Sequence, residues 1–156
     1  HRGGTGEVRF ESIDVLNQSM AAATTFAADD TLIVRGTYTA TKRVERPVFQ
    51  VAIVDVDTGV IVTTANSVRG DVPATVSGPG TIEMRFGRLP LRPRQYVLRL
   101  SITDAHQLGS YDEIVAGPRF AVTGSGGGVD SLADEQDGLV SVPCDVRHLA
   151  SEATRA

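Results

Sequence analysis

The sequence predicts an all-β fold in which two antiparallel sheets pack face to face as a sandwich. Ile82, Met84 and Phe86 alternate with polar residues, and a second alternating run covers 95–104. A period of two places each apolar set on one face of a strand. Between these runs, Leu89 to Pro93 contains two prolines, which remove ladder donors and favour a turn. Each strand would bury one face and leave the other free for polar side chains.

Short strand candidates recur along the chain and are separated by turn residues, a spacing typical of a β-sandwich. Turn signals stand at Asp29-Asp30, Asp57-Thr58-Gly59, Ser77 to Gly80 and Gly109-Ser110. The Ala-rich run 20–28 has no helical period, so we predict a loop there. The expected strands are 7–16, 31–40, 47–56, 60–66, 80–87, 95–104, 118–123 and 138–142. Apolar residues at 32/34, 49/51/53, 82/84/86 and 96/98/100/102 should share one core.

The pattern predicts a single domain over residues 1–143. Within it, residues 124–137 are glycine-rich and polar and are expected to form a flexible linker. The last strand, 138–142, would pair at a sheet edge, and we expect that edge to lie in a partner chain. Residues 144–156 form a polar tail.

Composition excludes several classes of protein. The chain has 156 residues with 15 basic and 19 acidic side chains, so its net charge of −4 argues against nucleic-acid binding. No apolar run is long enough to span a membrane. Cys144 is the only cysteine, which excludes an intramolecular disulfide and fits a reducing compartment. Because the chain does not begin with Met, we expect it to be a piece of a longer polypeptide.

No motif points to a cofactor or a metal. Asp55 to Gly59 is similar to the start of a calcium loop, but no Glu follows at the far end, and a tight hairpin is the favoured interpretation. His1, His106 and His148 lack metal-ligand spacing. The glycines at 4 and 6 and at 124–128 lack the strand and helix of a dinucleotide loop.

Catalytic signatures are equally weak, and we predict that the chain is not an enzyme. The sequence contains neither G-x-S-x-G nor G-x-x-x-x-G-K-[ST]. Asp104, Asp112 and Glu113 could form a glycosidase carboxylate pair, but solvated loop carboxylates are the simpler interpretation.

The outward faces of the strands carry the candidate binding residues. If Phe49, Val51 and Ile53 face the core, the residues between them face outward, and the same argument applies to the neighbouring strands. Amide, guanidinium and hydroxyl groups suit sugar hydroxyls, a small side chain leaves room for a ring, and a loop tyrosine can pack on its apolar face. The candidate carbohydrate-binding residues are Gln50, Ala52, Thr64, Asn66, Arg99, Ser101 and Tyr111. The alternative is an ordinary solvated sheet face.

The order of the strand segments resembles a known family. The segments that carry the resemblance are Gly4-Thr5-Gly6-Glu7-Val8-Arg9-Phe10, Asp30-Thr31-Leu32-Ile33-Val34, Pro47-Val48-Phe49-Gln50-Val51-Ala52-Ile53, Asn66-Ser67, Leu89-Pro90-Leu91, Gln95-Tyr96-Val97-Leu98, Phe120-Ala121-Val122 and Gly138-Leu139-Val140 before Pro143. Over about residues 4–143 they resemble the C-terminal domain of Wzt-type proteins, the ATP-binding subunits of ABC transporters that export O-antigen and related polysaccharides. The chain departs from the family pattern at Arg94-Gln95, where a glycine is frequent, and at Pro143-Cys144-Asp145.

The resemblance implies an immunoglobulin-like antiparallel β-sandwich that binds the exported glycan and forms a homodimer. It implies a cytoplasmic location, peripheral to the inner membrane through the transporter's membrane subunit, in O-antigen export and lipopolysaccharide biosynthesis. The ATPase would be a separate N-terminal domain. Two alternatives stay open: a dimerisation or protein-docking module without sugar binding, and a module appended to a glycoside-processing enzyme.

Overall fold

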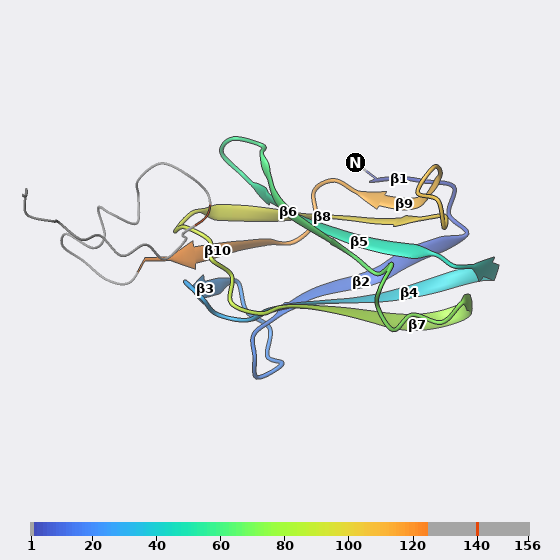
Figure 1. The fold of residues 1–156 in the computed structure, drawn as a ribbon, viewed down its shortest axis with the longest axis horizontal. Coiled ribbons are helices and arrows are strands. Elements are labelled where there is room, and N and C mark those ends of the chain that lie inside the picture. The colour runs from blue at the N-terminus through green and yellow to red at the C-terminus, as the bar shows by residue number, and fades with distance from the viewer. Residues whose placement is uncertain (1, 125–139, 141–156) are drawn as a thin grey trace, which may run out of the picture.

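The computed structural model describes residues 2–124 and residue 140, and in this part of the chain every regular element is a strand (Figure 1). The strands are β1 (Arg2–Gly3), β2 (Val8–Leu16), β3 (Thr25–Ala27), β4 (Leu32–Glu45), β5 (Val48–Asp55), β6 (Ile61–Asn66), β7 (Thr75–Phe86), β8 (Gln95–Thr103), β9 (Ser110–Ile114) and β10 (Arg119–Thr123).

The strands form a small sheet and a large sheet. The small sheet has the order β2-β4-β7. In the large sheet, β8 pairs along one side with β5, which in turn pairs with β6. The other side of β8 is shared: β9 and then β1 pair near its end, and β10 and then β3 pair near its start. All pairings are antiparallel except β3 with β10.

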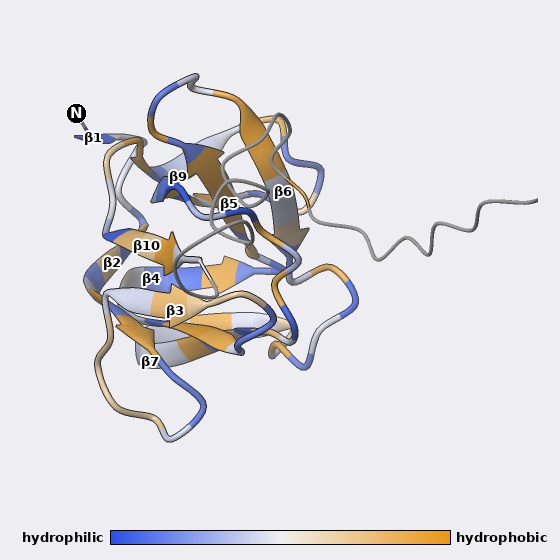
Figure 2. Cartoon of the chain, turned by 90° about the vertical axis from the view of Figure 1, so that its left-hand side faces the viewer, coloured by the Kyte–Doolittle hydropathy of each residue, from blue (hydrophilic) through white to orange (hydrophobic). Residues whose placement is uncertain are grey.

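The core lies between the two sheets, as the alternation predicts. Leu98, Leu100 and Ile102 of β8 are buried there, and Ile82 and Met84 of β7 pack against the core while half-buried. Apolar bands alternate with paler and polar ones along the strands in Figure 2. Aromatic rings join the layers: the ring centroid of Phe49 on β5 lies 6.2 Å from Phe10 of β2 and 4.9 Å from Tyr38 of β4. The predicted all-β sandwich is confirmed.

The predicted turn at Ser77 to Gly80 is wrong, because these residues belong to β7, which begins at Thr75 rather than at residue 80. Gly80 lies opposite Tyr38, and a Cβ at this glycine would stand 2.4 Å from the phenol oxygen. Gly78 has a φ of +69° and stands where the β4–β7 register shifts. Glycine is therefore required here by packing and by a bulge, not by a turn.

Three short strands escaped the sequence analysis, since runs of two to five residues carry little periodicity. These are β1, β3 within the predicted loop 20–28, and β9 at the predicted turn Gly109-Ser110. Most of the predicted last strand, 138–142, lies outside the described residues, as do the linker 125–137 and the tail 144–156. Val140, which is described, forms an isolated antiparallel bridge with Leu91.

Candidate functional site

A hollow of about 190 Å³ opens on the outer face of the large sheet, across β6, β5, β8 and the end of β9. It is smaller than the roughly 300–1,000 Å³ of clefts that enclose a drug-sized ligand, so it suits a single small ring. Its lining residues are Gln50, Ala52, Ile61, Thr64, Arg99, Leu100, Ser101, Glu113, Ile114 and Val115.

Strand register brings five of the predicted residues into this hollow. On β5, Gln50 lies opposite Ser101 of β8, and Ala52 lies between Arg99 of β8 and Thr64 of β6. Directly opposed residues of an antiparallel pair have Cβ atoms about 4.5–5.5 Å apart on the same face. Side chains that are far apart in the sequence therefore meet on one surface.

Ala52 forms the floor of the hollow. It is 6% exposed, while its cross-strand neighbours Thr64 and Arg99 are exposed and rise on either side. A methyl group between two longer side chains leaves a depression that a larger residue would fill. The hollow therefore depends on the small size of this one residue.

The polar groups of the hollow are free to meet a ligand. Four polar side chains have no hydrogen-bond or ion-pair partner among the described residues. They belong to Gln50, Thr64, Arg99 and Ser101. Glu113 is different, because its Oε1 accepts a hydrogen bond from Ser110 at 2.6 Å. The hollow thus combines an amide, two hydroxyls, a guanidinium and a carboxylate, which together donate and accept hydrogen bonds.

Apolar side chains wall the hollow on two sides. Ile61 is 52% exposed at the start of β6, and Val115 is 42% exposed just beyond β9. Exposed apolar atoms beside convergent polar groups are the usual make-up of a small-ligand site. The arrangement can hold a ring that has hydroxyl groups at its edge and C–H groups on its face.

Two of the predicted residues do not line the hollow. Asn66 ends β6 and its side-chain Oδ1 accepts a hydrogen bond from the Val68 N–H at 3.1 Å, beside a neighbouring hollow. Tyr111 lies in β9, not in a loop as predicted, and packs half-buried against the core. Burial raises the pKa of the Tyr111 phenol. The structure therefore places the Tyr111 ring away from the position where it would stack on a sugar in the hollow.

Sequence reasoning did not place Ile61, Glu113 and Val115 in the binding site, and it considered Glu113 only as a catalytic carboxylate. Glu113 lies at the end of β9 and Val115 just beyond it. This strand, Ser110–Ile114, is short, and its pairing with β8 has a register shift at Ile102 and Thr103, so its alternation is weak in the sequence. Glu113 lies directly opposite Ser101, which was predicted to face outward, but this register could not be read from the sequence.

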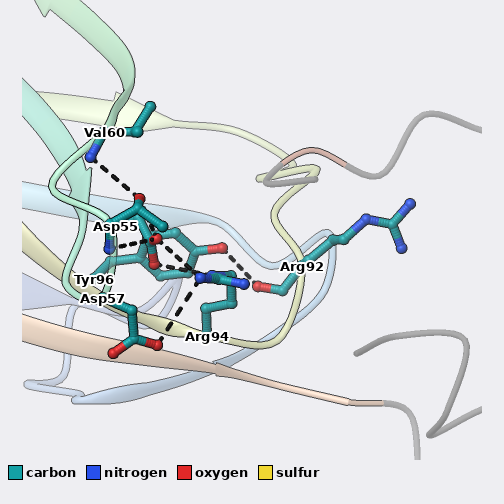
Figure 3. A network of polar contacts seen from close by, with 7 residues as sticks. Asp55, Asp57, Val60, Arg92, Arg94 and Tyr96 are labelled. Atoms are coloured by element: carbon teal, nitrogen blue, oxygen red, sulfur yellow. Dashed lines mark hydrogen bonds and ion pairs between the residues drawn. The ribbon is translucent and has the colours of Figure 1, made fainter. Parts of the chain in front are cut away.

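The residues Asp55 to Gly59 form a tight hairpin, which is the interpretation that the sequence favoured. The Asp55 N–H donates to the Val60 carbonyl at 2.9 Å, which closes the turn. The Asp55 carboxylate is fully buried and accepts hydrogen bonds from Arg94 Nε at 2.9 Å and Nη2 at 3.0 Å (Figure 3). These bonds hold the pKa of Asp55 at about 2, against the effect of its burial. The Asp55 carboxylate therefore stabilises the fold through Arg94.

The other acidic residues considered for catalysis also have structural partners. Asp112 is buried and bound by Arg2 through Nε at 2.9 Å and Nη2 at 2.8 Å. Asp104 accepts backbone N–H groups of the loop that follows β8, which lowers its pKa. Across residues 2–124, no group of three or more His, Cys, Asp and Glu side chains could hold a metal ion.

Comparison with known proteins decides the family. The model of the Wzt C-terminal domain family matches residues 1–141. The chain belongs to the Wzt C-terminal domain family. A solved structure described as the C-terminal domain of Wzt superposes with a TM-score of 0.76 at 15% identity, covering 96% of this chain and 88% of that one. A search of curated proteins by sequence gives no significant match.

A second solved structure shares the fold. The Niemann-Pick type C2 protein from the Japanese carpenter ant superposes with a TM-score of 0.53 at 9% identity, over 79% of this chain and 98% of that one. Both matches concern the fold, and they agree with the predicted immunoglobulin-like sandwich. In the described residues, no helix has the length and apolar character needed to cross a bilayer.

Membership of the Wzt C-terminal domain family places the chain in the ABC transporter context predicted from the sequence. The structure gives a role to one residue of the departure noted at Arg94-Gln95. Arg94 is the ion-pair partner of buried Asp55. The remaining departure, Pro143-Cys144-Asp145, lies outside the described residues.

Proposed function

We propose that this domain recognises the glycan exported by a polysaccharide ABC transporter, and that it does so in the hollow over β5 and β8. The observation that carries the proposal is the gathering of Gln50, Thr64, Arg99 and Ser101 around the floor at Ala52. Their side chains have no partner among the described residues, so a ligand can satisfy them without breaking an internal bond.

The chemistry of the hollow favours a carbohydrate. Sugar hydroxyls both donate and accept hydrogen bonds, which matches the mixture of Gln50, Thr64, Ser101 and Arg99. The aliphatic side chain of Ile61 offers a surface for the C–H face of a ring. A hollow of about 190 Å³ would read one sugar residue at a time.

In this proposal the domain binds and orients the glycan near the translocator and does no chemistry itself. ATP would be hydrolysed by a separate ATPase domain of the transporter subunit, and the present sequence contains no phosphate-binding loop. The domain would act in the cytoplasm, held near the inner membrane by the transporter's membrane subunit. Dimerisation by exchange of residues 138–142 stays a prediction, since only Val140 of that segment is described.

Calorimetric titration tests the proposal directly. The chain is titrated with polysaccharide prepared from the organism that carries it, and we expect saturable binding. Ala52→Leu fills the floor of the hollow and should abolish that binding while the thermal melting curve stays close to wild type. Thr39→Leu, which enlarges a side chain on the outer face of the small sheet, is the matched control and should bind normally. If the unaltered chain fails to bind, or if both variants bind equally, the proposal is wrong.

A further inference from the structure

A second hollow, of about 330 Å³, lies at the end of the sandwich where β4 passes into β5 (Figure 1). Its volume falls within the roughly 300–1,000 Å³ of clefts that enclose a small ligand. Three loops line it: residues 46–47 between β4 and β5, residues 67–74 between β6 and β7, and residues 105–106 between β8 and β9. We call it the loop pocket. It shares no lining residue with the hollow of the large sheet, so it is a separate site.

The polar side chains of the loop pocket are hydrogen-bond donors. Arg46, Ser67 and His106 line it, one from each loop, and none of the described residues that line it is acidic. A guanidinium carries five N–H donors, and a hydroxyl and an imidazole ring carry at least one each. The side chains of Arg46 and His106 form no hydrogen bond or ion pair with the described residues. The pocket therefore favours a ligand that accepts hydrogen bonds and carries negative charge.

Ser67 is held against β5 by its own backbone and side chain. Its N–H donates to the Phe49 carbonyl, and its Oγ accepts the Phe49 N–H, both at 2.9 Å. Because Oγ is the acceptor in that bond, its own proton is left to be donated to a ligand. The position of this hydroxyl is thus fixed before any ligand arrives.

His106 stands in a loop that Asp104 holds in shape. The Asp104 carboxylate accepts the N–H groups of His106 at 2.9 Å, Leu108 at 3.1 Å and Gly109 at 2.8 Å. The Asp104 N–H donates to the Gly109 carbonyl at 3.0 Å, which closes the same loop. These bonds use the backbone of His106 and leave its imidazole ring exposed.

Arg46 has an unusual backbone conformation. Its φ is +47°, in the left-handed region that non-glycine residues rarely adopt, and its N–H donates to the Ala74 carbonyl at 2.7 Å. Gln107, next to His106, is also left-handed with a φ of +57°. Residues held in such conformations cluster at ligand sites, where the surrounding structure fixes them against their own preference. Two of the three loops of the pocket contain one.

Apolar side chains form the remaining walls of the loop pocket. Pro47 and Val48 are buried at its base, Val72 is half-buried, and Val68 is 60% exposed at its rim. An exposed valine beside unpartnered donors offers a surface to the organic part of a ligand. A bare inorganic anion would leave this surface in water.

We propose that the loop pocket binds a phosphate ester, with the phosphate on Arg46, Ser67 and His106 and the organic group against Val68 and Val72. Donors from three loops suit a phosphate, which has three or more acceptor oxygens, better than a carboxylate, which has two. The planar guanidinium can contact two of these oxygens at once. The organic group is either a sugar or a hydrocarbon chain, since the apolar walls can pack on both.

Titration followed by amide NMR tests the ligand class. The probes are glucose 1-phosphate and geranyl phosphate, which represent a sugar phosphate and a lipid phosphate, with inorganic phosphate and glucuronate as controls. We expect saturable binding of at least one ester, with shifts at the amides of Ser67 and His106, and binding at least about tenfold weaker for both controls. The tighter ester identifies the organic group. No saturable binding of either ester, shifts confined to the hollow of the large sheet, or equal binding of a control overturns the proposal.

A glycine variant tests the site without harming the fold. Arg46→Gly removes the cation at a position whose positive φ glycine adopts without strain, so the melting temperature should not fall. Its affinity for the tighter ester should fall by about tenfold or more. Arg69→Ala removes the same charge from the 67–74 loop outside the pocket lining and is the matched control.

Two further comparisons complete the test. Arg69→Ala should keep wild-type affinity for the ester, and so should Arg99→Ala, which alters the hollow of the large sheet. His106→Ala should weaken the ester by about threefold to tenfold, because it removes one donor from an exposed position. Unchanged affinity in Arg46→Gly, or equal losses in Arg46→Gly and Arg69→Ala, would show that the loop pocket is not the binding site.

Discussion

Arg94 and Arg99 are close neighbours in the sequence, one just before β8 and one in its middle, yet their surroundings are opposite. Arg94 is 27% exposed and binds the fully buried Asp55 through two nitrogens. The Arg99 side chain is exposed in the hollow of the large sheet, and its guanidinium takes part in no hydrogen bond or ion pair with the described residues. The same side chain is thus bound internally at one position and available at the other.

Under the proposed function, the difference separates stability from recognition within a short stretch of the chain. At Arg94 the internal partner satisfies the guanidinium, which adds to folding and leaves little for a ligand. At Arg99 the guanidinium is solvated in the free protein and can exchange water for a ligand oxygen. The two positions therefore predict different phenotypes for the same substitution.

The largest expected effect is on folding, from Arg94→Ala. This change leaves the Asp55 carboxylate buried without its cation, and breaking a buried pair in this way costs about 3–5 kcal/mol. Urea denaturation should show that loss in the free energy of unfolding. Arg99→Ala is the control, and its free energy of unfolding should stay within about 0.5 kcal/mol of wild type, as for other exposed sites. Equal losses in both variants would remove the distinction between the two arginines.

The next effect is on binding, from Arg99→Ala. Loss of a charge-assisted hydrogen bond lowers affinity by about tenfold to a hundredfold. Titration with the organism's polysaccharide measures it. Arg9→Ala removes the same charge from an exposed position on β2, in the other sheet, and should leave the dissociation constant unchanged. If the two variants weaken binding equally, the effect is one of net charge and not of the hollow.

A smaller effect is expected on acidification. The folded pKa of Asp55 is about 2, against 3.8 as the ordinary value, because Arg94 favours the carboxylate. A depressed carboxyl pKa stabilises the fold above the unfolded pKa, and that contribution is lost as pH falls from about 4 to about 2. The loss is about 2 kcal/mol for this group. Urea melts at a series of pH values should show a shallower acid dependence in Asp55→Asn, whereas an unchanged slope would mean that other carboxylates dominate.

The fold was predictable because its signal is local. Alternation at Ile82, Met84 and Phe86 reports a half-buried strand whatever the strand pairs with. The same pleat placed Gln50 and Arg99 on the outward faces, and the structure brings both into one hollow. What the alternation could not give was the neighbour of each strand, since pairing depends on distant segments.

The site residues that the sequence analysis overlooked were overlooked because strand pairing cannot be read from local alternation. Glu113 and Val115 were overlooked because β9 is short and its pairing with β8 is interrupted by a register shift. Tyr111 was assigned to a loop for the same reason. The bond between Asp55 and Arg94 depends on the register that sets Asp55 opposite Tyr96, which no local pattern shows.

The smallest and most discriminating effect comes from lysine at each of the two positions. Lysine keeps the charge but loses the planar fork that contacts a carboxylate or hydroxyl pair with two parallel hydrogen bonds. In Arg94→Lys one of the two bonds to Asp55 is lost, and we expect about 1 kcal/mol of destabilisation. In Arg99→Lys the free energy of unfolding should not change, while affinity for the polysaccharide falls by about threefold to tenfold if the guanidinium binds through its fork. Full affinity in Arg99→Lys, beside a weakened Arg99→Ala, would mean that the hollow uses this residue as a point charge alone.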